Sequence, residues 1–160
     1  MTVFDNVLVG AFRKSPERRE AFEKAAECIR LCGLEPFQHK LAGELSIGGK
    51  KRLEMARALA TRPKLLMLEE VMAGLTSTEV KASVEVIRRL RESGMTMMIV
   101  EHVMEGIVPI ADKIVVLDGG VKIAEDVPER IINDERVIEA YLGAKYSQRF
   151  KAMKVGRPLG

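Results

Sequence analysis

The sequence predicts an α/β fold with an all-helical front part, and three observations lead to this expectation. Residues 65–68 and 95–100 are continuous apolar runs bounded by turn signals, which is typical of parallel strands buried on both faces. Residues 113–126 contain two strand-like runs around Asp118-Gly119-Gly120, a strong hairpin signal. Residues 1–61 show helical periodicity alone, so we expect them to form a separate helical lobe.

Three helices are expected in this lobe. The first covers residues 2–13. The second has Ser15 as its N-cap, with proline at the first helical position, and ends at Gly33. The third begins at Ser46, another N-cap, and runs to about Thr61. Four further helices are expected at residues 77–93, 103–110, 128–133 and 135–142.

Composition and charge limit the kinds of partner. The 160 residues are 47% hydrophobic and 31% charged, which is enough apolar material for a core of ordinary size. Five Lys or Arg and no acid lie in residues 144–160, so the net charge of +3 leaves −2 on residues 1–143. The body is therefore not a basic nucleic-acid binder. For the basic tail, contact with acidic lipid or nucleic acid and a solvated, partly disordered terminus both stay open.

No direct membrane insertion is expected, because no apolar run reaches the length of about 18 residues that a spanning helix needs. Any membrane role is expected to come through a partner. Cys28 and Cys32 are the two cysteines, four residues apart on an expected helix, and a zinc site needs more ligands than these. We expect two reduced, partly buried thiols, which fits a cytosolic protein.

The segment Leu45-Ser46-Ile47-Gly48-Gly49 lies at the start of the third expected helix. Free backbone N–H groups and the helix dipole make such a position favourable for an anion. The hydroxyl of Ser46 adds a donor, and Gly48 and Gly49 let the backbone approach a phosphate without a Cβ in the way. A serine N-cap followed by glycines is also a common structural feature, so this segment alone leaves both interpretations open.

Polar side chains follow the two apolar strands. Glu69 and Glu70 come at the end of the first strand, where ligands of open α/β sheets lie. Two acids there can hold a magnesium ion and position an attacking water, although an exposed pair that starts a loop fits equally well. His102 follows the second strand, where it can hydrogen-bond a terminal phosphate. A lone histidine is otherwise a structural residue.

In combination, these segments resemble the ATP-binding subunits of ABC transporters. Residues 45–59, LSIGGKKRLEMARAL, resemble the signature motif and the helix after it. Residues 65–70 resemble the Walker B strand, residues 73–76 lie where the D-loop belongs, and His102 lies at the switch histidine. Similarity to branched-chain amino-acid importers in particular comes from four segments: NVLVG, RRLRESGMTMMIVEH, DKIVVLDGGVKIAED and VIEAYLG. The resemblance covers residues 1–143.

The resemblance implies a partial P-loop NTPase core, with parallel strands and a C-terminal hairpin, next to a helical lobe that carries the signature motif. Residues 1–61 would be this lobe and residues 62–143 the C-terminal part of the α/β ATPase core, followed by the basic tail at residues 144–160.

In the family two ATPase subunits face each other head to tail, and ATP with Mg²⁺ lies between the Walker A loop of one and the signature motif of the other. By resemblance, Ser46 and Gly48 would contact the γ-phosphate of ATP bound by the partner, and Gly49, where Gln is usual, belongs to the same cofactor-binding segment. Glu69 would be the magnesium-associated acid, Glu70 would polarise the attacking water, and His102 would hold the γ-phosphate. The implied partners are a second ATPase subunit, identical or different, and membrane permease subunits, which would place the chain at the cytoplasmic face of the membrane.

The sequence departs from the family pattern in several places. It contains no G-x-x-x-x-G-K-[ST] motif, so it resembles a C-terminal portion without Walker A and Q-loop. The P-loop amides and lysine are the main grip on the phosphates, so we expect the isolated chain to bind Mg-ATP poorly and turn it over negligibly. Smaller departures are Ile47 in the signature motif, Glu69 in place of Asp, Val71 in place of Pro and Thr76 in the D-loop.

Two functions therefore stand side by side. The first is an ATP-binding subunit, or a remnant of one, that energises the import of branched-chain amino acids by ATP hydrolysis. The alternative is a non-hydrolysing interaction module that pairs with an intact ATPase. In either case the strand at residues 65–68 lacks the neighbour that leads into Walker A, which leaves an open edge and an uncovered apolar surface. We therefore predict that the chain self-associates or rearranges to cover that edge.

Overall fold

The computed structural model describes residues 1–142, which pack into two compact units. The first unit is Met1–Ile110, and the second begins at Ala111. Each unit has buried apolar side chains of its own. The basic tail expected at residues 144–160 lies outside the described residues.

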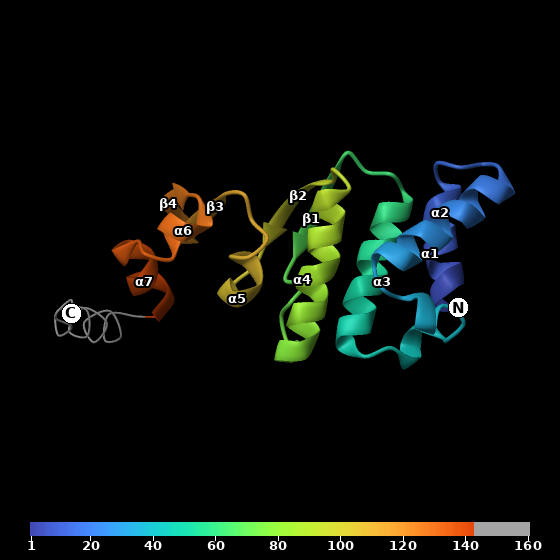
Figure 1. Ribbon diagram of the computed structural model, residues 1–160, viewed down its shortest axis with the longest axis horizontal. Helices are drawn as coiled ribbons and strands as arrows, with labels where there is room; N and C mark the ends of the chain where they lie inside the picture. The colour runs from blue at the N-terminus through green and yellow to red at the C-terminus, as the bar shows by residue number, and fades with distance from the viewer. Residues whose placement is uncertain (143–160) are drawn as a thin grey trace. The chain divides into compact units, whose positions relative to one another are not determined.

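The front of the first unit is helical, as expected. Its helices are α1 (Val3–Phe12), α2 (Arg18–Leu31) and α3 (Ile47–Ala60). Two 3-10 turns, Glu35–Phe37 and Ala42–Glu44, lead from α2 to α3, and α1 packs against both of these helices (Figure 1). Gly10 permits this packing, because a Cβ there would lie 2.7 Å from the carbonyl oxygen of Arg57 in α3.

A strand-helix-strand segment follows in the same unit. Its elements are β1 (Leu65–Glu69), α4 (Ser77–Glu92), β2 (Thr96–Val100) and the short helix α5 (Met104–Ile107). β1 and β2 pair in parallel, with Leu65 opposite Thr96 and Glu69 opposite Val100. This pairing confirms the predicted parallel strands. It also sets the carboxyl ends of both strands at one edge, where the candidate acids and histidine follow.

The expectation that residues 65–68 are buried on both faces is wrong. Leu66 and Leu68 are 3% and 6% exposed, whereas Leu65 and Met67 are 47% and 65% exposed. In the part of the chain that the structure describes, this sheet has two strands, and their side chains alternate between a covered and an open face. Four exposed apolar side chains form what we name the open sheet face: Leu65, Met67, Met98 and Val100. The uncovered apolar surface expected from the sequence is therefore present.

Ser15 is not the N-cap of α2, contrary to the sequence prediction. The helix begins at Arg18, after Glu17 as N-cap, and Glu17 makes no side-chain capping bond. The N–H of Ser15 instead donates to the carbonyl of Ala11 at 3.1 Å, so Ser15 closes the end of α1. Its hydroxyl oxygen is buried without a hydrogen-bond partner. Gly33 ends α2 as expected, in the left-handed region with a φ of 63°.

The two cysteines are free thiols, as expected, and they are fully rather than partly buried. Burial raises the pKa of Cys28 to about 11 and that of Cys32 to about 12, because a thiolate is costly in apolar surroundings. Both side chains therefore pack in the core as neutral, small apolar groups.

The second unit contains the expected hairpin. β3 (Ile114–Asp118) pairs antiparallel with β4 (Val121–Asp126), and the turn between them has Gly119 and Gly120 at positive φ. Glycine adopts this conformation without the strain that a Cβ would bring.

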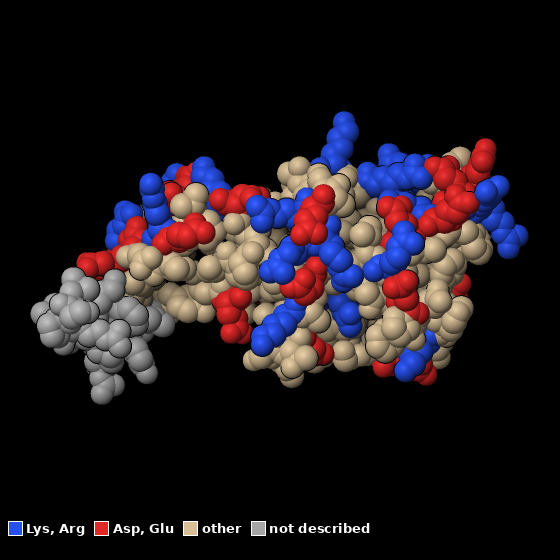
Figure 2. Space-filling model, viewed as in Figure 1, with Lys and Arg blue, Asp and Glu red and all other residues tan. Residues whose placement is uncertain are grey.

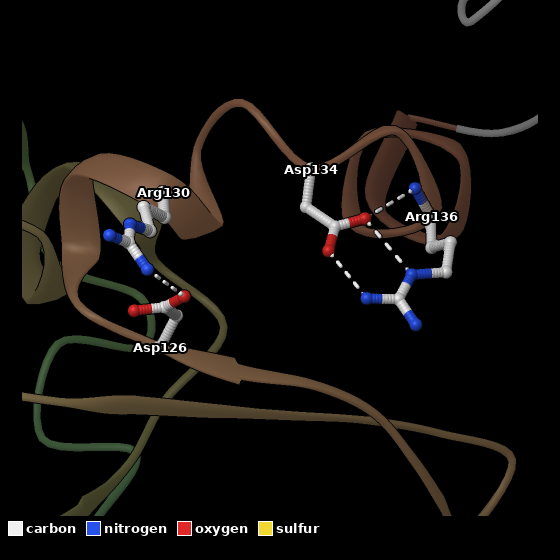
Figure 3. A network of polar contacts seen from close by, with 4 residues as sticks. All are labelled: Asp126, Arg130, Asp134 and Arg136. Atoms are coloured by element: carbon white, nitrogen blue, oxygen red, sulfur yellow. Dashed lines mark hydrogen bonds and ion pairs between the residues drawn. The ribbon is translucent and has the colours of Figure 1, made fainter.

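Two short helices follow the hairpin in the described residues, α6 (Pro128–Ile131) and α7 (Glu135–Leu142). Figure 3 shows two ion pairs in this region, Asp126 with Arg130 at 3.2 Å and Asp134 with Arg136 at 2.7 Å. Each pair joins residues that are close in sequence, so these charges fix local backbone turns and do not gather into one site.

The boundary between the packed units lies after Ile110, whereas the sequence predicts a division after residue 61. One core cluster joins the helical front to β1 and α4, so the lobes at residues 1–61 and 62–143 stay a prediction about the family's architecture.

Within residues 1–142, no helix combines the length and apolar character needed to cross a membrane. On the face shown in Figure 2, Lys and Arg side chains are interspersed with Asp and Glu over the first unit.

Candidate functional site

The N-terminus of α3 has the geometry of a capped helix. Ser46 has extended backbone angles, and its Oγ accepts a hydrogen bond from the N–H of Gly49 at 3.2 Å, which confirms the predicted cap. Gly48 and Gly49 lie in the first turn. A Cβ at Gly48 would lie 3.0 Å from the Oε1 of Glu79, so the absence of a side chain lets α4 approach this turn closely.

Glu79 is a neighbour of residues 45–49, which we name the signature segment, and the sequence did not reveal this contact. The hydroxyl of Ser46 donates to Oε1 of Glu79 at 3.1 Å. The N–H and hydroxyl of Thr76 donate to Oε2 at 3.2 and 3.1 Å, which caps the start of α4. The hydrogen bonds from Thr76 and then Ser46 lower the pKa of Glu79 from its usual value.

The carboxyl end of β1 carries the two predicted acids. Glu69 is the last residue of β1 and is exposed. Glu70 follows with a φ of 48°, a left-handed conformation that is uncommon outside glycine. Its N–H donates to the carbonyl of Val100 at 2.9 Å, and its carbonyl accepts from Nζ of Lys51 in α3 at 2.9 Å. The backbone of the predicted catalytic glutamate is therefore held from two sides.

At the end of β2, Glu101 and His102 have different environments. The side chain of Glu101 is fully buried, and it accepts from the N–H of Met72 at 2.5 Å and from the N–H of His102 at 3.1 Å. Glu101 thus ties the loop after β1 to the end of β2. The side chain of His102 is 67% exposed, with Nδ1 4.0 Å from Glu101.

Sequence reasoning gave no role to Glu101, Lys51 or Glu79. An acid directly after an apolar strand was the one sequence signal for Glu101. The contact of Lys51 with Glu70 and that of Glu79 with Ser46 bridge 19 and 33 residues, so they depend on how the helices pack. Glu79 also closes a capping box with Thr76, and this T-x-x-E pattern was a local signal for its place at the start of α4.

The candidate residues fall into two groups. Glu69, Glu70 and His102 lie at the carboxyl ends of paired strands, because β1 and β2 are parallel and in register. The signature residues lie at the start of α3 with Glu79. Lys51 connects the groups, since it belongs to α3 and binds the carbonyl of Glu70.

The donor set at the strand ends fits Mg²⁺ in the way that nucleotide sites use it. Magnesium commonly takes one or two carboxylates and completes its shell with water and substrate phosphates. Glu69 and Glu70 offer such carboxylates. Among the described residues, no three His, Cys, Asp or Glu side chains gather as a cage that would hold a metal unaided.

Two hollows among the described residues lie away from the candidate residues. A hollow of about 370 Å³ lies between α1 and α3, and another of about 260 Å³ lies beside α4. Neither is lined by Ser46, Glu69, Glu70 or His102.

Comparison with known families agrees with these motifs. The family model described as "ABC transporter" matches residues 1–73. The model described as "Branched-chain amino acid ATP-binding cassette transporter" matches residues 121–147. The two matches cover both ends of the region that resembles the branched-chain importers.

Among curated proteins, the chain is similar to the high-affinity branched-chain amino acid transport ATP-binding protein BraF of Pseudomonas aeruginosa. Identity is 42% over 134 residues, covering 83% of this chain and 52% of BraF. This chain is also 38% identical over 159 residues to the high-affinity branched-chain amino acid transport ATP-binding protein LivG of Escherichia coli K12, covering 89% of this chain and 62% of LivG. The chain thus spans between half and two thirds of the length of these relatives.

Solved structures show the same fold. The ATP-binding cassette MJ1267 matches with a TM-score of 0.76 and 30% identity, over 88% of this chain and 62% of that chain. MJ0796, in a dimeric post-hydrolysis state bound to ADP and Pi, matches with a TM-score of 0.65 and 26% identity, over 80% of this chain and 57% of that chain. Together with the family models and the relatives, these matches show that the chain belongs to the ABC transporter ATP-binding family, in its branched-chain amino-acid type.

Proposed function

We propose that the chain forms one side of an ATP site in a branched-chain amino-acid importer, with ATP held by a second ATP-binding subunit. The names of BraF and LivG support this transport class. The dimeric state of MJ0796 supports the pairing of two cassettes around nucleotide. The observation that carries the proposal is the capped N-terminus of α3, with Ser46 as N-cap and Gly48 and Gly49 in the first turn.

The N-terminus of α3 has features that favour binding of a phosphate. The first N–H groups of a helix have no partner within the helix and point outward, where they attract negative charge. Ser46 lies at the surface and adds a hydroxyl. Gly48 brings no side chain of its own, but it is buried against Glu79, so a phosphate reaches its backbone after the Glu79 side chain moves. Ser46, Gly48 and Gly49 would therefore bind the γ-phosphate of ATP that the partner holds.

The residues at the strand ends would act on a second ATP, the one on this chain's own side of the pair, and each has a distinct task in its hydrolysis. Glu69 would hold Mg²⁺, which when bound neutralises phosphate charge. Glu70 would orient the attacking water and draw its proton, since its carbonyl and N–H are already fixed by Lys51 and Val100. The exposed imidazole of His102 would donate to an oxygen of the terminal phosphate.

One observation favours the alternative, a non-hydrolysing interaction module that pairs with an intact ATPase. The 160 residues contain no G-x-x-x-x-G-K-[ST] motif, the loop whose amides and lysine hold the phosphates. In this case Glu69, Glu70 and His102 have no nucleotide of their own to act on, and the signature segment alone contributes to an ATP site.

The proposed partners follow from the family. A second ATP-binding subunit, either another copy or a different chain, would face the signature segment. Membrane permease subunits would hold the pair at the cytoplasmic side of the membrane, so that the chain itself needs no spanning helix.

Pairing can be tested by sedimentation of the chain with an intact branched-chain-type ATP-binding subunit, with and without Mg-ATP. The proposal predicts a heterodimer that forms only with nucleotide. Substitution S46D should weaken this dimer, by about tenfold or more, because aspartate still caps the helix but repels a phosphate.

The matched control is T2D, the same kind of change at the N-cap of α1. It should leave nucleotide-dependent pairing unchanged. A heterodimer that forms equally well without nucleotide, or that tolerates S46D as well as T2D, would contradict the proposed role of the signature segment.

A further inference from the structure

We propose that Glu79 is a built-in competitor for the phosphate that the signature segment, residues 45–49, accepts. The inference rests on the proposed function of Ser46. Glu79 lies in the first turn of α4, and the hydroxyl of Ser46 donates to its Oε1 at 3.1 Å. The place of a phosphate oxygen on Ser46 is therefore taken by a carboxylate of the same chain.

The hydroxyl of Ser46 cannot serve both anions at once. A serine hydroxyl has a single O–H donor and two acceptor lone pairs. Its donor goes to Glu79, and a lone pair accepts from the N–H of Gly49 at 3.2 Å. An ionised phosphate oxygen only accepts hydrogen bonds, so it binds Ser46 after Glu79 has released the donor.

The carboxylate also opposes a phosphate through its charge. The hydrogen bonds from Thr76 and Ser46 favour the ionised form of Glu79. Its Oε1 lies so near Gly48 that a Cβ there would be only 3.0 Å away. A phosphate that approaches the Gly48 backbone therefore meets a like charge at close range.

A displaced Glu79 keeps a second set of partners. Oε1 binds Ser46, whereas Oε2 accepts from the N–H and the hydroxyl of Thr76. A rotation of the carboxylate away from Ser46 can therefore preserve the cap of α4. Exchange of Glu79 for phosphate at Ser46 would link the signature segment to Thr76, in the loop after β1, because the Glu79 side chain bonds both Ser46 and Thr76.

The test is a titration of the whole chain with inorganic phosphate, followed through the amide NMR signals of Gly48 and Gly49. Substitution E79Q removes the charge but keeps the size of the side chain and an acceptor for Thr76. We expect the phosphate dissociation constant of E79Q to be about tenfold lower than that of the wild type. E85Q, the same change farther along α4, should match the wild type.

The proposed competition is supported if the double variant E79Q/S46A loses the increase in phosphate affinity that E79Q shows. Equal affinity of wild type and E79Q, or an equal gain in E85Q, overturns it and leaves the proposed function standing. No phosphate response at Gly48 and Gly49 in either protein also overturns the competitor, whereas the proposed function stands or falls with the nucleotide-dependent pairing described above. E79D keeps the charge and the N-terminal acid of α4 but shortens the reach to Ser46. It should raise the phosphate affinity less than E79Q does, and it serves as the test if E79Q does not fold.

Discussion

At the scale of single residues, two serines show how far a local pattern extends. Ser46 was predicted as an N-cap and is one, because its hydroxyl bonds the N–H of Gly49. Ser15 has an equally suitable pattern, with proline next, yet it closes α1 and leaves its hydroxyl buried and unpaired. The pattern describes what a residue can do, whereas tertiary packing decides where the chain turns. For the same reason the contact between Ser46 and Glu79 was not predictable.

The two serines should respond oppositely to alanine. S15A removes a buried hydroxyl without a partner, so the free energy of unfolding should stay unchanged or rise by up to about 1 kcal/mol. S46A removes a real cap and should lower it by about 1 kcal/mol. Urea unfolding of both variants followed by circular dichroism measures the difference.

A loss of about 1 kcal/mol in S15A would show instead that Ser15 caps α2, as the sequence alone suggested. A neutral control is T78A, an alanine substitution at a hydroxyl residue that is exposed on α4. S93A is less suitable as a control, because the hydroxyl of Ser93 donates to the carbonyl of Leu90.

At the scale of elements, β1 shows what an apolar run does and does not determine. The run at residues 65–68 predicted a strand, and the second run predicted its parallel neighbour, both correctly. The burial of both faces could not be deduced, since it depends on how many strands and helices surround the sheet. In the described residues Leu66 and Leu68 face the core, and Leu65 and Met67 do not.

Alanine substitutions along β1 should therefore alternate in their effect. L66A creates a cavity in the core and should cost about 2–5 kcal/mol of unfolding free energy. M67A removes a mostly exposed side chain and should cost less than about 1 kcal/mol. The measurement is chemical unfolding at low protein concentration, so that association does not bury Met67. Equal large losses at both positions would show that the strand is covered on both faces.

At the scale of the whole molecule, the open sheet face has consequences for association. Its four apolar side chains lie together on two strands whose outer edges have no partner among the described residues. Exposed apolar strands with free edges pair with other chains. The self-association expected from the sequence therefore has a defined surface.

Light scattering over a range of concentrations should show a mass that rises above that of the monomer. Substitution M67K should suppress this rise, because a charge in the middle of the open sheet face opposes its burial. V115K, at a similarly exposed apolar position of β3, is the matched control and should leave the rise unchanged. A wild-type chain that stays monomeric at high concentration would count against this surface.

The family could be recognised from the order of its motifs, because Ser46, Glu69, Glu70 and His102 each stand at a predictable end of a helix or strand. The function of this chain depends on more than these motifs, namely on a nucleotide that a partner brings to the signature segment at Ser46. The most direct test of this central claim is calorimetric titration of the chain alone with Mg-ATP, together with a phosphate-release assay. Our account predicts no binding in the micromolar range and no steady release of phosphate. Micromolar affinity with continuous phosphate release from the chain alone would contradict it.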